Sequence, residues 1–316
     1  MPAPHGSEPN SFRQSGAELR TSRISAGIDG TGVALALGGG FARGFAHLGV
    51  LEVLEQEHIA VSAIAGTSIG ALLGAAYADG FLIRELCDIG RQVRMRDFIR
   101  FQRSAHITPG CDRIGQFVQE WFQAMRVEEL CIPTAIITTD IDTCAPHVFT
   151  RGPLDVALRA TCAFPGLFQP VEHEGRLLAD GCLVAPVPTA VAARMNALCV
   201  LGVAVGSAIV GAPSSNGASS RSGPAARRSR PEHGHSGRHL SKSRHEPSWS
   251  RHADVLLEPE VQEVHWDDFA SVDQAHAAGV KAMRRALPGL RELLDLRSSL
   301  RRPQEATGLA QSGVAS

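Results

Sequence analysis

The residues with the clearest chemical potential are Gly66-Thr67-Ser68-Ile69-Gly70, a serine with a glycine two positions away on each side. The pattern lies where an apolar run, 59–65, gives way to a run rich in alanine and leucine, 71–78. A serine at a sharp strand-to-helix turn forms a nucleophile elbow, in which flanking side chains would collide with the neighbouring strand and helix. The hydroxyl then lies at a helix N-terminus, which favours developing negative charge. The alternative is a tight turn whose serine caps the helix.

A second glycine-rich turn, Gly38–Gly44 ("GGGFARG"), follows the short apolar run 33–37. Consecutive glycines can aim several backbone N–H groups at one point, which is how an oxyanion or a phosphate is held. A dinucleotide fingerprint needs a different glycine spacing, and a P-loop needs a G-K-[ST] sequence that is absent here. Two neighbouring parallel strands end at the same edge of a sheet, so we expect this turn to provide an oxyanion hole for Ser68.

The third feature is Asp180-Gly181-Cys182. A serine hydroxyl is a poor nucleophile until a base takes its proton, and a carboxylate beside it can do so. The alternative is an ordinary Asp-Gly turn between two short strands. The hypothesis of a nucleophilic serine therefore requires that Ser68 and Asp180 meet in space.

Apolar runs that end in glycine and are followed by helical repeats indicate βαβ units on a mostly parallel sheet. We predict an α/β domain over residues 31–300 with a disordered insertion at about 207–252, and disordered tails at 1–30 and 301–316. Further elements are predicted from periodicity: helices at 111–125, 154–163 and 271–296, and buried strands at 134–141 and 196–206.

Composition narrows the possible partners and the compartment. The net charge of −1 over 316 residues argues against nucleic-acid binding. Seven scattered cysteines without a C-x-x-C pair argue against a disulfide framework or a zinc ribbon, and no apolar signal region precedes residue 30. The apolar run 197–212 is read as a buried strand rather than a membrane span. These features predict a cytoplasmic protein, and the basic and apolar mixture in 91–103 is a candidate for peripheral membrane contact or a solvated basic segment.

Together these stretches resemble the patatin-like phospholipase family, particularly its bacterial members and the catalytic domain of neuropathy target esterase. The resemblance covers about residues 33–205. It rests on five ordered motifs: "LALGGGFARGFAHLGVLEVLE", "AIAGTSIGALLGAAYA", "TTDI", "RATCAFPGLFQPV" and "LLADGCLVAPVP". The family implies a three-layer α/β/α sandwich and a Ser–Asp dyad without a catalytic histidine. It also implies hydrolysis of acyl esters in phospholipids, lysophospholipids or neutral lipids, with no metal or organic cofactor.

Carried over residue by residue, the resemblance implies that Ser68 is the acyl-accepting nucleophile and Asp180 its general base. Backbone N–H groups around Gly39, Gly40 and Phe41 become the oxyanion hole. Arg43 fixes that loop. Five glycines belong to the same motifs and support their turns: Gly38, Gly44, Gly66, Gly70 and Gly181.

Two residues depart from the family pattern. Phe41 replaces a glycine of the triplet, and Cys182 replaces the small residue after Asp-Gly. Both keep open a second hypothesis, a catalytically lapsed scaffold with a binding or regulatory role. A third is an α/β-hydrolase with a Ser–Asp–His triad, for which His265 and His276 are the candidates to test.

Overall fold

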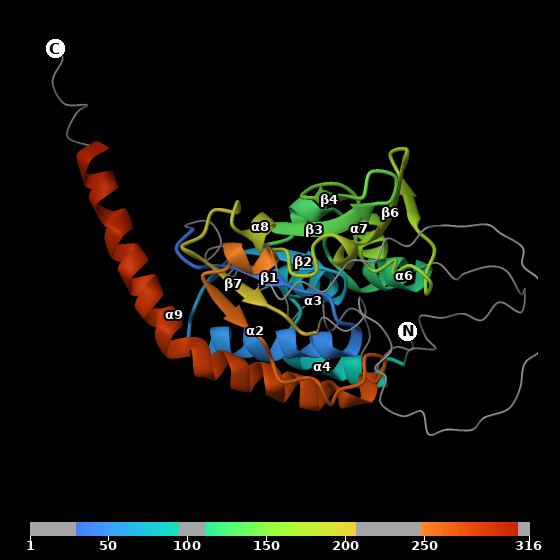
Figure 1. Ribbon diagram of the computed structural model, residues 1–316, viewed down its shortest axis with the longest axis horizontal. Coiled ribbons are helices and arrows are strands. Elements are labelled where there is room, and N and C mark those ends of the chain that lie inside the picture. The colour runs from blue at the N-terminus through green and yellow to red at the C-terminus, as the bar shows by residue number, and fades with distance from the viewer. Residues whose placement is uncertain (1–29, 95–110, 207–247, 309–316) are drawn as a thin grey trace, which may run out of the picture.

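The computed structural model describes residues 30–94, 111–206 and 248–308, which form a mixed eight-stranded sheet flanked by helices (Figure 1). The strands are β1 (Val33–Leu37), β2 (Val61–Thr67), β3 (Thr134–Asp140), β4 (Ala145–Phe149), β5 (Val171–His173), β6 (Arg176–Asp180), β7 (Cys199–Val203) and β8 (Val255–Leu257). The α-helices are α2 (Ala46–Gln56), α3 (Ile69–Asp79), α4 (Ile83–Gln92), α6 (Asp112–Trp121), α7 (Leu154–Thr161), α8 (Thr189–Ala192) and α9 (Val272–Gly308). Short 3₁₀ helices are η1 (Phe41–Phe45), η2 (Val127–Glu129), η3 (Gly181–Leu183), η4 (Ser248–His252) and η5 (Phe269–Ser271).

The sheet has the strand order β5-β6-β3-β2-β1-β7-β8, with β4 paired to β3. Strands β3, β2, β1, β7 and β8 run parallel, whereas β4 and β6 pair antiparallel with β3, and β5 pairs antiparallel with β6. The parallel part is built from strand–turn–helix units, since β1 leads through η1 to α2 and β2 leads directly to α3. The predicted α/β class with a mostly parallel sheet is confirmed.

The two faces of the sheet pack against different layers. In β1, Val33, Leu35 and Leu37 point into the larger core, while Ala34 and Ala36 point to the other face, as the period-2 geometry of a strand requires. The larger core is formed with α2, α3, α4, α6, α7 and α9. The smaller core is lined mainly by alanines, which allow the chain around α8 to approach the sheet closely.

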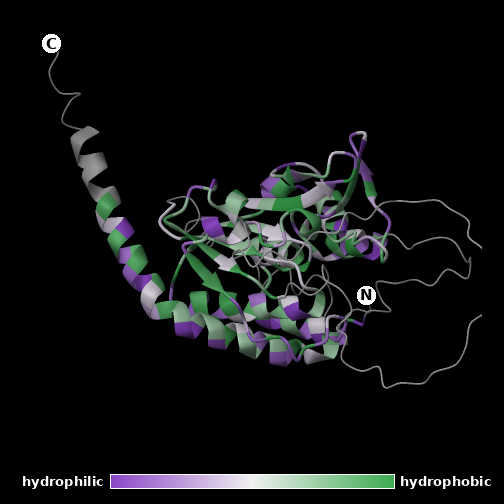
Figure 2. Ribbon diagram, viewed as in Figure 1, coloured by the Kyte–Doolittle hydropathy of each residue, from purple (hydrophilic) through white to green (hydrophobic). Residues whose placement is uncertain are grey.

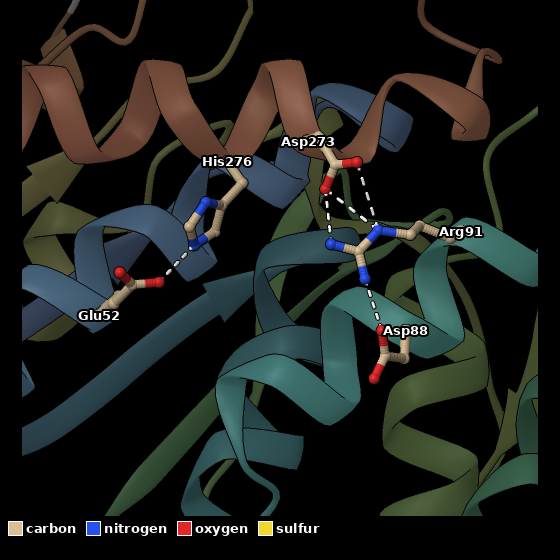
Figure 3. Close-up of polar contacts among 5 residues, drawn as sticks. All are labelled: Glu52, Asp88, Arg91, Asp273 and His276. Carbon is tan, nitrogen blue, oxygen red and sulfur yellow. Dashed lines mark hydrogen bonds and ion pairs between the residues drawn. The ribbon is translucent and has the colours of Figure 1, made fainter.

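Helix α9 runs along α2, and its C-terminal part extends past the rest of the molecule (Figure 1). Figure 2 shows that both helices carry alternating apolar and polar bands. Polar contacts also tie α9 to its neighbours, because His276 Nε2 lies 2.8 Å from Glu52 and Asp273 accepts from Arg91 at 2.6 Å (Figure 3). Partly exposed pairs of this kind contribute about 0–1 kcal/mol each, so the close packing of α9 on α2 contributes most to this contact.

The observed boundaries differ from the predicted ones by four or more residues at three places. Helix α6 ends at Trp121 rather than at 125, because the chain turns there to bring Phe122 into the core. Helix α9 continues to Gly308, so residues 301–308 are helical rather than part of a disordered tail. Residues 248–252, placed in the insertion, form η4. The remainder of the predicted tails and insertion lies outside the described residues, as does the part of the basic segment after Arg94.

The run 197–212 contains strand β7, as the sequence predicted, and residues beyond 206 are outside the described part. Among the described residues, no helix combines the length and the apolar character that a membrane crossing requires.

The crossing of α2 and α9 predicts opposite effects for two glycine substitutions in one helix. A Cβ on Gly279 would lie 1.9 Å from Ala46 O, whereas a Cβ on Gly289 would meet nothing within 4 Å. Gly279→Ala should therefore lower the free energy of unfolding by about 1–3 kcal/mol, since two backbones must separate. Gly289→Ala should raise it by about 0.5–1 kcal/mol through helix propensity. Urea denaturation measures both, and equal stabilisation by the two changes would contradict the described crossing.

Candidate active site

The hydroxyl of Ser68 donates a hydrogen bond to Asp180 Oδ2 at 2.7 Å, although the two residues are 112 positions apart. Strand register explains how they meet. The last residue of β2, Thr67, pairs with Ile137 of β3, and the last residue of β6, Asp180, pairs with the next residue, Thr138. Because β4 occupies the opposite edge of β3, strands β2 and β6 share one edge and meet end to end.

Ser68 has the strained backbone of a nucleophile elbow. Its φ of 54° and ψ of −126° lie in a region that non-glycine residues rarely adopt, at a cost of about 1–3 kcal/mol. The side chain of Thr161 holds this conformation, because its hydroxyl accepts from Ser68 N–H at 2.9 Å and donates to Ile137 O. Sequence reasoning missed Thr161. The available signal was a hydroxyl on the apolar face of a predicted helix, close before Pro165.

The glycines around Ser68 are required by close approach. A Cβ on Gly66 would lie 2.4 Å from Ala71 Cα in α3, and a Cβ on Gly70 would lie 2.3 Å from Leu37 O in β1. Both distances are far below any tolerable carbon contact, so the predicted collision with the neighbouring helix and strand is confirmed.

Asp180 is fully buried, and burial raises the pKa of its carboxyl group from an ordinary 3.8 to about 6. Hydrogen bonds from the Cys182 backbone N–H to Oδ1, at 2.8 Å, and from Ser68 to Oδ2 favour the charged form and offset part of this rise. A carboxylate with a pKa near neutrality, in contact with a hydroxyl, has the properties of a general base.

The glycine turn Gly38–Gly44 lies at the same end of the sheet as Ser68. One of its three predicted oxyanion donors already makes a hydrogen bond. Gly39 N–H donates to Pro186 O at 3.1 Å, so this amide is already engaged. The amides of Gly40 and Phe41 make no hydrogen bond within the described residues. Two of the three predicted oxyanion donors are therefore available, one fewer than the sequence suggested.

Phe41 adopts a left-handed conformation, with φ of 51°, where the family pattern has glycine. Its ring makes edge-to-face contacts with Trp266, at a centroid distance of 5.2 Å, and with Phe164, at 5.9 Å. Such aromatic pairs contribute about 0.5–1.5 kcal/mol each, which is enough to offset the backbone strain. The aromatic contacts therefore stabilise phenylalanine in this left-handed conformation.

The turn is held in place by residues between β8 and η5 and by a buried histidine. Arg43 Nε donates to Val264 O at 2.8 Å, and Ala42 N–H donates to Trp266 O at 3.0 Å. His47 Nε2 lies 2.8 Å from Gly38 O, and burial lowers the pKa of His47 to about 4. The imidazole is therefore neutral at physiological pH and donates from Nε2, which fixes the orientation of the first peptide of the turn.

The candidate triad histidines bond elsewhere. His265 contacts Asp267, and His276 contacts Glu52 on α2. Within the described part of the chain, no histidine hydrogen-bonds to Ser68 or Asp180. No group of three or more metal-ligating side chains is placed to hold a metal ion there either.

Residues 35–193 match the family model described as patatin-like phospholipase. The chain belongs to this family. An uncharacterized NTE family protein of Mycobacterium tuberculosis is 38% identical over 168 residues, a match that covers 52% of this chain and 46% of that protein. Human patatin-like phospholipase domain-containing protein 6 is 32% identical over 200 residues, covering 59% of this chain and 14% of the human protein. A Caenorhabditis elegans patatin-like phospholipase domain-containing protein is 33% identical over 206 residues, covering 59% of this chain and 14% of that protein.

The matched region thus spans less than half of the length of these relatives. Among solved structures, VipD from Legionella pneumophila aligns with 56% of this chain and 50% of its own, at 13% identity and a TM-score of 0.38. That likeness is too low to support an argument about this chain.

Two cysteines flank the Ser68–Asp180 pair of this patatin-like protein. Cys182 packs on the glycine turn, where a Cβ on Gly39 would lie 2.1 Å from its sulfur, and Cys162 lines the pocket at Ser68. Burial raises the pKa of both thiols well above their usual range, so both stay protonated and are poor nucleophiles at neutral pH. Cysteine at position 182 therefore acts as a small packing residue.

A narrow pocket opens at Ser68 in the patatin-like site. Apart from the serine, its lining is apolar: Phe41, Ile69, Leu72, Ile114, Cys162, Phe168 and Phe269. Phe269 comes from η5, beyond the end of the family match at residue 193. An apolar pocket beside the Ser68 hydroxyl suits a hydrocarbon group rather than a charged one.

The buried carboxylate of this patatin-like site predicts a pH-dependent gain in stability for Asp180→Asn. A native pKa of about 6 against an unfolded value of 3.8 means that ionising Asp180 costs the folded state about 3 kcal/mol above pH 6. Asp180→Asn should therefore unfold at a higher temperature than wild type at pH 8, and this difference should shrink as the pH falls from 6 to about 4.

Thermal unfolding by circular dichroism measures this effect, with the exposed Asp142→Asn as a matched control that should change little. A lower melting temperature for Asp180→Asn at pH 8 would contradict the burial of an ionisable carboxyl group.

Proposed function

We propose that the protein is a serine lipid acyl hydrolase that cleaves carboxylic ester bonds of phospholipids or lysophospholipids. The observation that carries this proposal is the 2.7 Å hydrogen bond from Ser68 to Asp180, made at a strained elbow. Beside it lie the amides of Gly40 and Phe41, which make no hydrogen bond within the described residues. Membership of the patatin-like phospholipase family supports the same chemistry.

In the proposed reaction, Asp180 takes the hydroxyl proton as Ser68 attacks the ester carbonyl carbon. The carbonyl oxygen becomes an oxyanion and accepts hydrogen bonds from the N–H groups of Gly40 and Phe41 at the start of η1. When the carbon–oxygen bond to the alcohol breaks, Asp180 returns its proton to the leaving alkoxide. A water molecule, deprotonated by Asp180, then attacks the acyl carbon. As the bond to Ser68 Oγ breaks, Asp180 returns this proton to Oγ, which releases the carboxylic acid product and restores the free hydroxyl. These steps need no metal or organic cofactor.

The seven cysteines are free, which suits a reducing compartment such as the cytoplasm. Access to lipid would then come from peripheral contact with a membrane surface. The predicted contact segment lies largely outside the described residues, so it remains a hypothesis based on the sequence.

Labelling with a fluorophosphonate probe tests the nucleophile and separates a hydrolase from a lapsed scaffold. Wild type should label, Ser68→Ala should not, and Asp180→Asn should label at least 100-fold more slowly because the general base is lost. Ser299→Ala, which removes an exposed hydroxyl on α9, is the matched serine control and should label at the wild-type rate. Absence of labelling in folded wild-type protein would favour the lapsed scaffold.

The pH profile tests which group is the base. Asp180 must be deprotonated to accept the proton, so the labelling rate should fall about tenfold per pH unit below a midpoint near 6. The profile should persist in His265→Gln and His276→Gln, since neither imidazole contacts the dyad. Loss of labelling in either histidine variant would instead support a Ser–Asp–His triad.

A further inference from the structure

Phe41 carries one of the two proposed oxyanion donors in a backbone conformation that phenylalanine rarely adopts. Its φ is 51°, and its N–H group makes no hydrogen bond within the described residues. The left-handed conformation lowers the population of a residue with a Cβ by roughly fivefold to 150-fold, whereas glycine adopts it without this penalty. Contacts from elsewhere in the chain must therefore hold Phe41 in place.

The backbone is hydrogen-bonded on both sides of Phe41. Before it, Gly39 N–H donates to Pro186 O at 3.1 Å, and after it, Ala42 N–H donates to Trp266 O at 3.0 Å. Because both flanking peptides are bonded, Phe41 can relax to a negative φ only if its Cα atom and its ring also move. The contacts of the ring therefore decide whether the N–H group of Phe41 keeps its direction.

The ring of Phe41 contacts two aromatic side chains edge to face. The Trp266 ring lies at a centroid distance of 5.2 Å and an interplanar angle of 73°, and the Phe164 ring lies at 5.9 Å. Trp266 is the nearer of the two, and its carbonyl group also accepts from Ala42. A single residue thus holds both the ring of Phe41 and the peptide that follows it.

The sizes of these effects show why one ring can matter. Each edge-to-face pair favours the conformation that makes it by roughly twofold to tenfold. Two pairs together therefore give roughly fourfold to 100-fold, which is similar to the penalty of the left-handed backbone. Without the Trp266 ring, the contact with Phe164 offsets only part of this penalty. Phe41 then relaxes, and its N–H group turns away from the oxyanion.

The segment that carries Trp266 is itself fixed to the rest of the molecule. It comprises residues 258–271, between β8 and α9, and two residues that precede the tryptophan, Val261 and Val264, are buried in the larger core. The carbonyl of Val264 also accepts from Arg43 Nε at 2.8 Å. The segment is therefore attached to the core on one side and to the glycine turn on the other.

We propose that the indole of Trp266 is a positioning residue for the oxyanion hole, and that phenylalanine at position 41 creates the need for it. The inference rests on the proposed function and adds a residue outside the matched region 35–193. Trp266 does not line the pocket described at Ser68, so it acts through Phe41 rather than on the ester. With glycine at position 41, the left-handed conformation needs no support and the indole becomes dispensable.

A double-mutant cycle tests this dependence, with the maximal rate of fluorophosphonate labelling and the half-saturating probe concentration as readouts. Trp266→Ala should lower the maximal rate about tenfold and change the half-saturating concentration less than about twofold, because the oxyanion hole acts in the transition state. Relative to Phe41→Gly alone, adding Trp266→Ala should lower the rate less than about threefold. Trp266→Phe, which keeps an aromatic edge, should retain at least about a third of the wild-type rate. If Trp266→Ala does not fold, Trp266→Leu replaces it in both backgrounds.

Gln262→Ala, an exposed position on the same segment, is the matched control and should label at the wild-type rate. All variants should keep the same pH midpoint, since none of them changes the surroundings of Asp180. Equal loss in the two backgrounds would overturn the proposal, because Trp266 would then support the segment rather than Phe41. An unchanged rate in Trp266→Ala, or a shifted pH midpoint, would also overturn it. Failure of the proposed function is distinct, because folded wild type would then not label at all.

Discussion

The hydrogen bond between Ser68 Oγ and Asp180 Oδ2 is the interaction on which the rest of the site depends. It exists because β2 and β6 approach each other along one edge of β3 and stop at adjacent residues. A carboxyl group buried there keeps a pKa of about 6, high enough to hold a proton and low enough to be a carboxylate at neutral pH. The sheet thus fixes both the position and the proton affinity of the proposed base.

The glycine turn that faces this bond is supported from a distant part of the chain. Carbonyl groups of Val264 and Trp266 accept from Arg43 and Ala42, and the Trp266 ring packs on Phe41. These supports lie beyond residue 193, where the family match ends. The C-terminal segment therefore contributes to the site, because it holds in place the turn that carries the proposed oxyanion donors.

Local patterns made much of this architecture predictable. Apolar runs ending in glycine identified β1 and β2 and the turns after them, and the spacing around Ser68 predicted the close contacts that exclude any side chain at Gly66 and Gly70. Contacts between distant segments were not predictable in the same way. The role of Thr161, the engagement of Gly39 N–H by Pro186 and the packing of Trp266 on Phe41 each depend on strand order or chain crossing. A single sequence does not encode such pairings in its local periodicity.

An experimental structure of the protein after reaction with a fluorophosphonate would test the central claim most directly. We expect the phosphorus to be bonded to Ser68 Oγ, with one phosphoryl oxygen about 2.7–3.1 Å from the amide nitrogens of Gly40 and Phe41. Asp180 should remain buried beside the adduct. A phosphoryl oxygen directed away from both amides, or an adduct on another residue, would contradict the account of how this site stabilises an oxyanion.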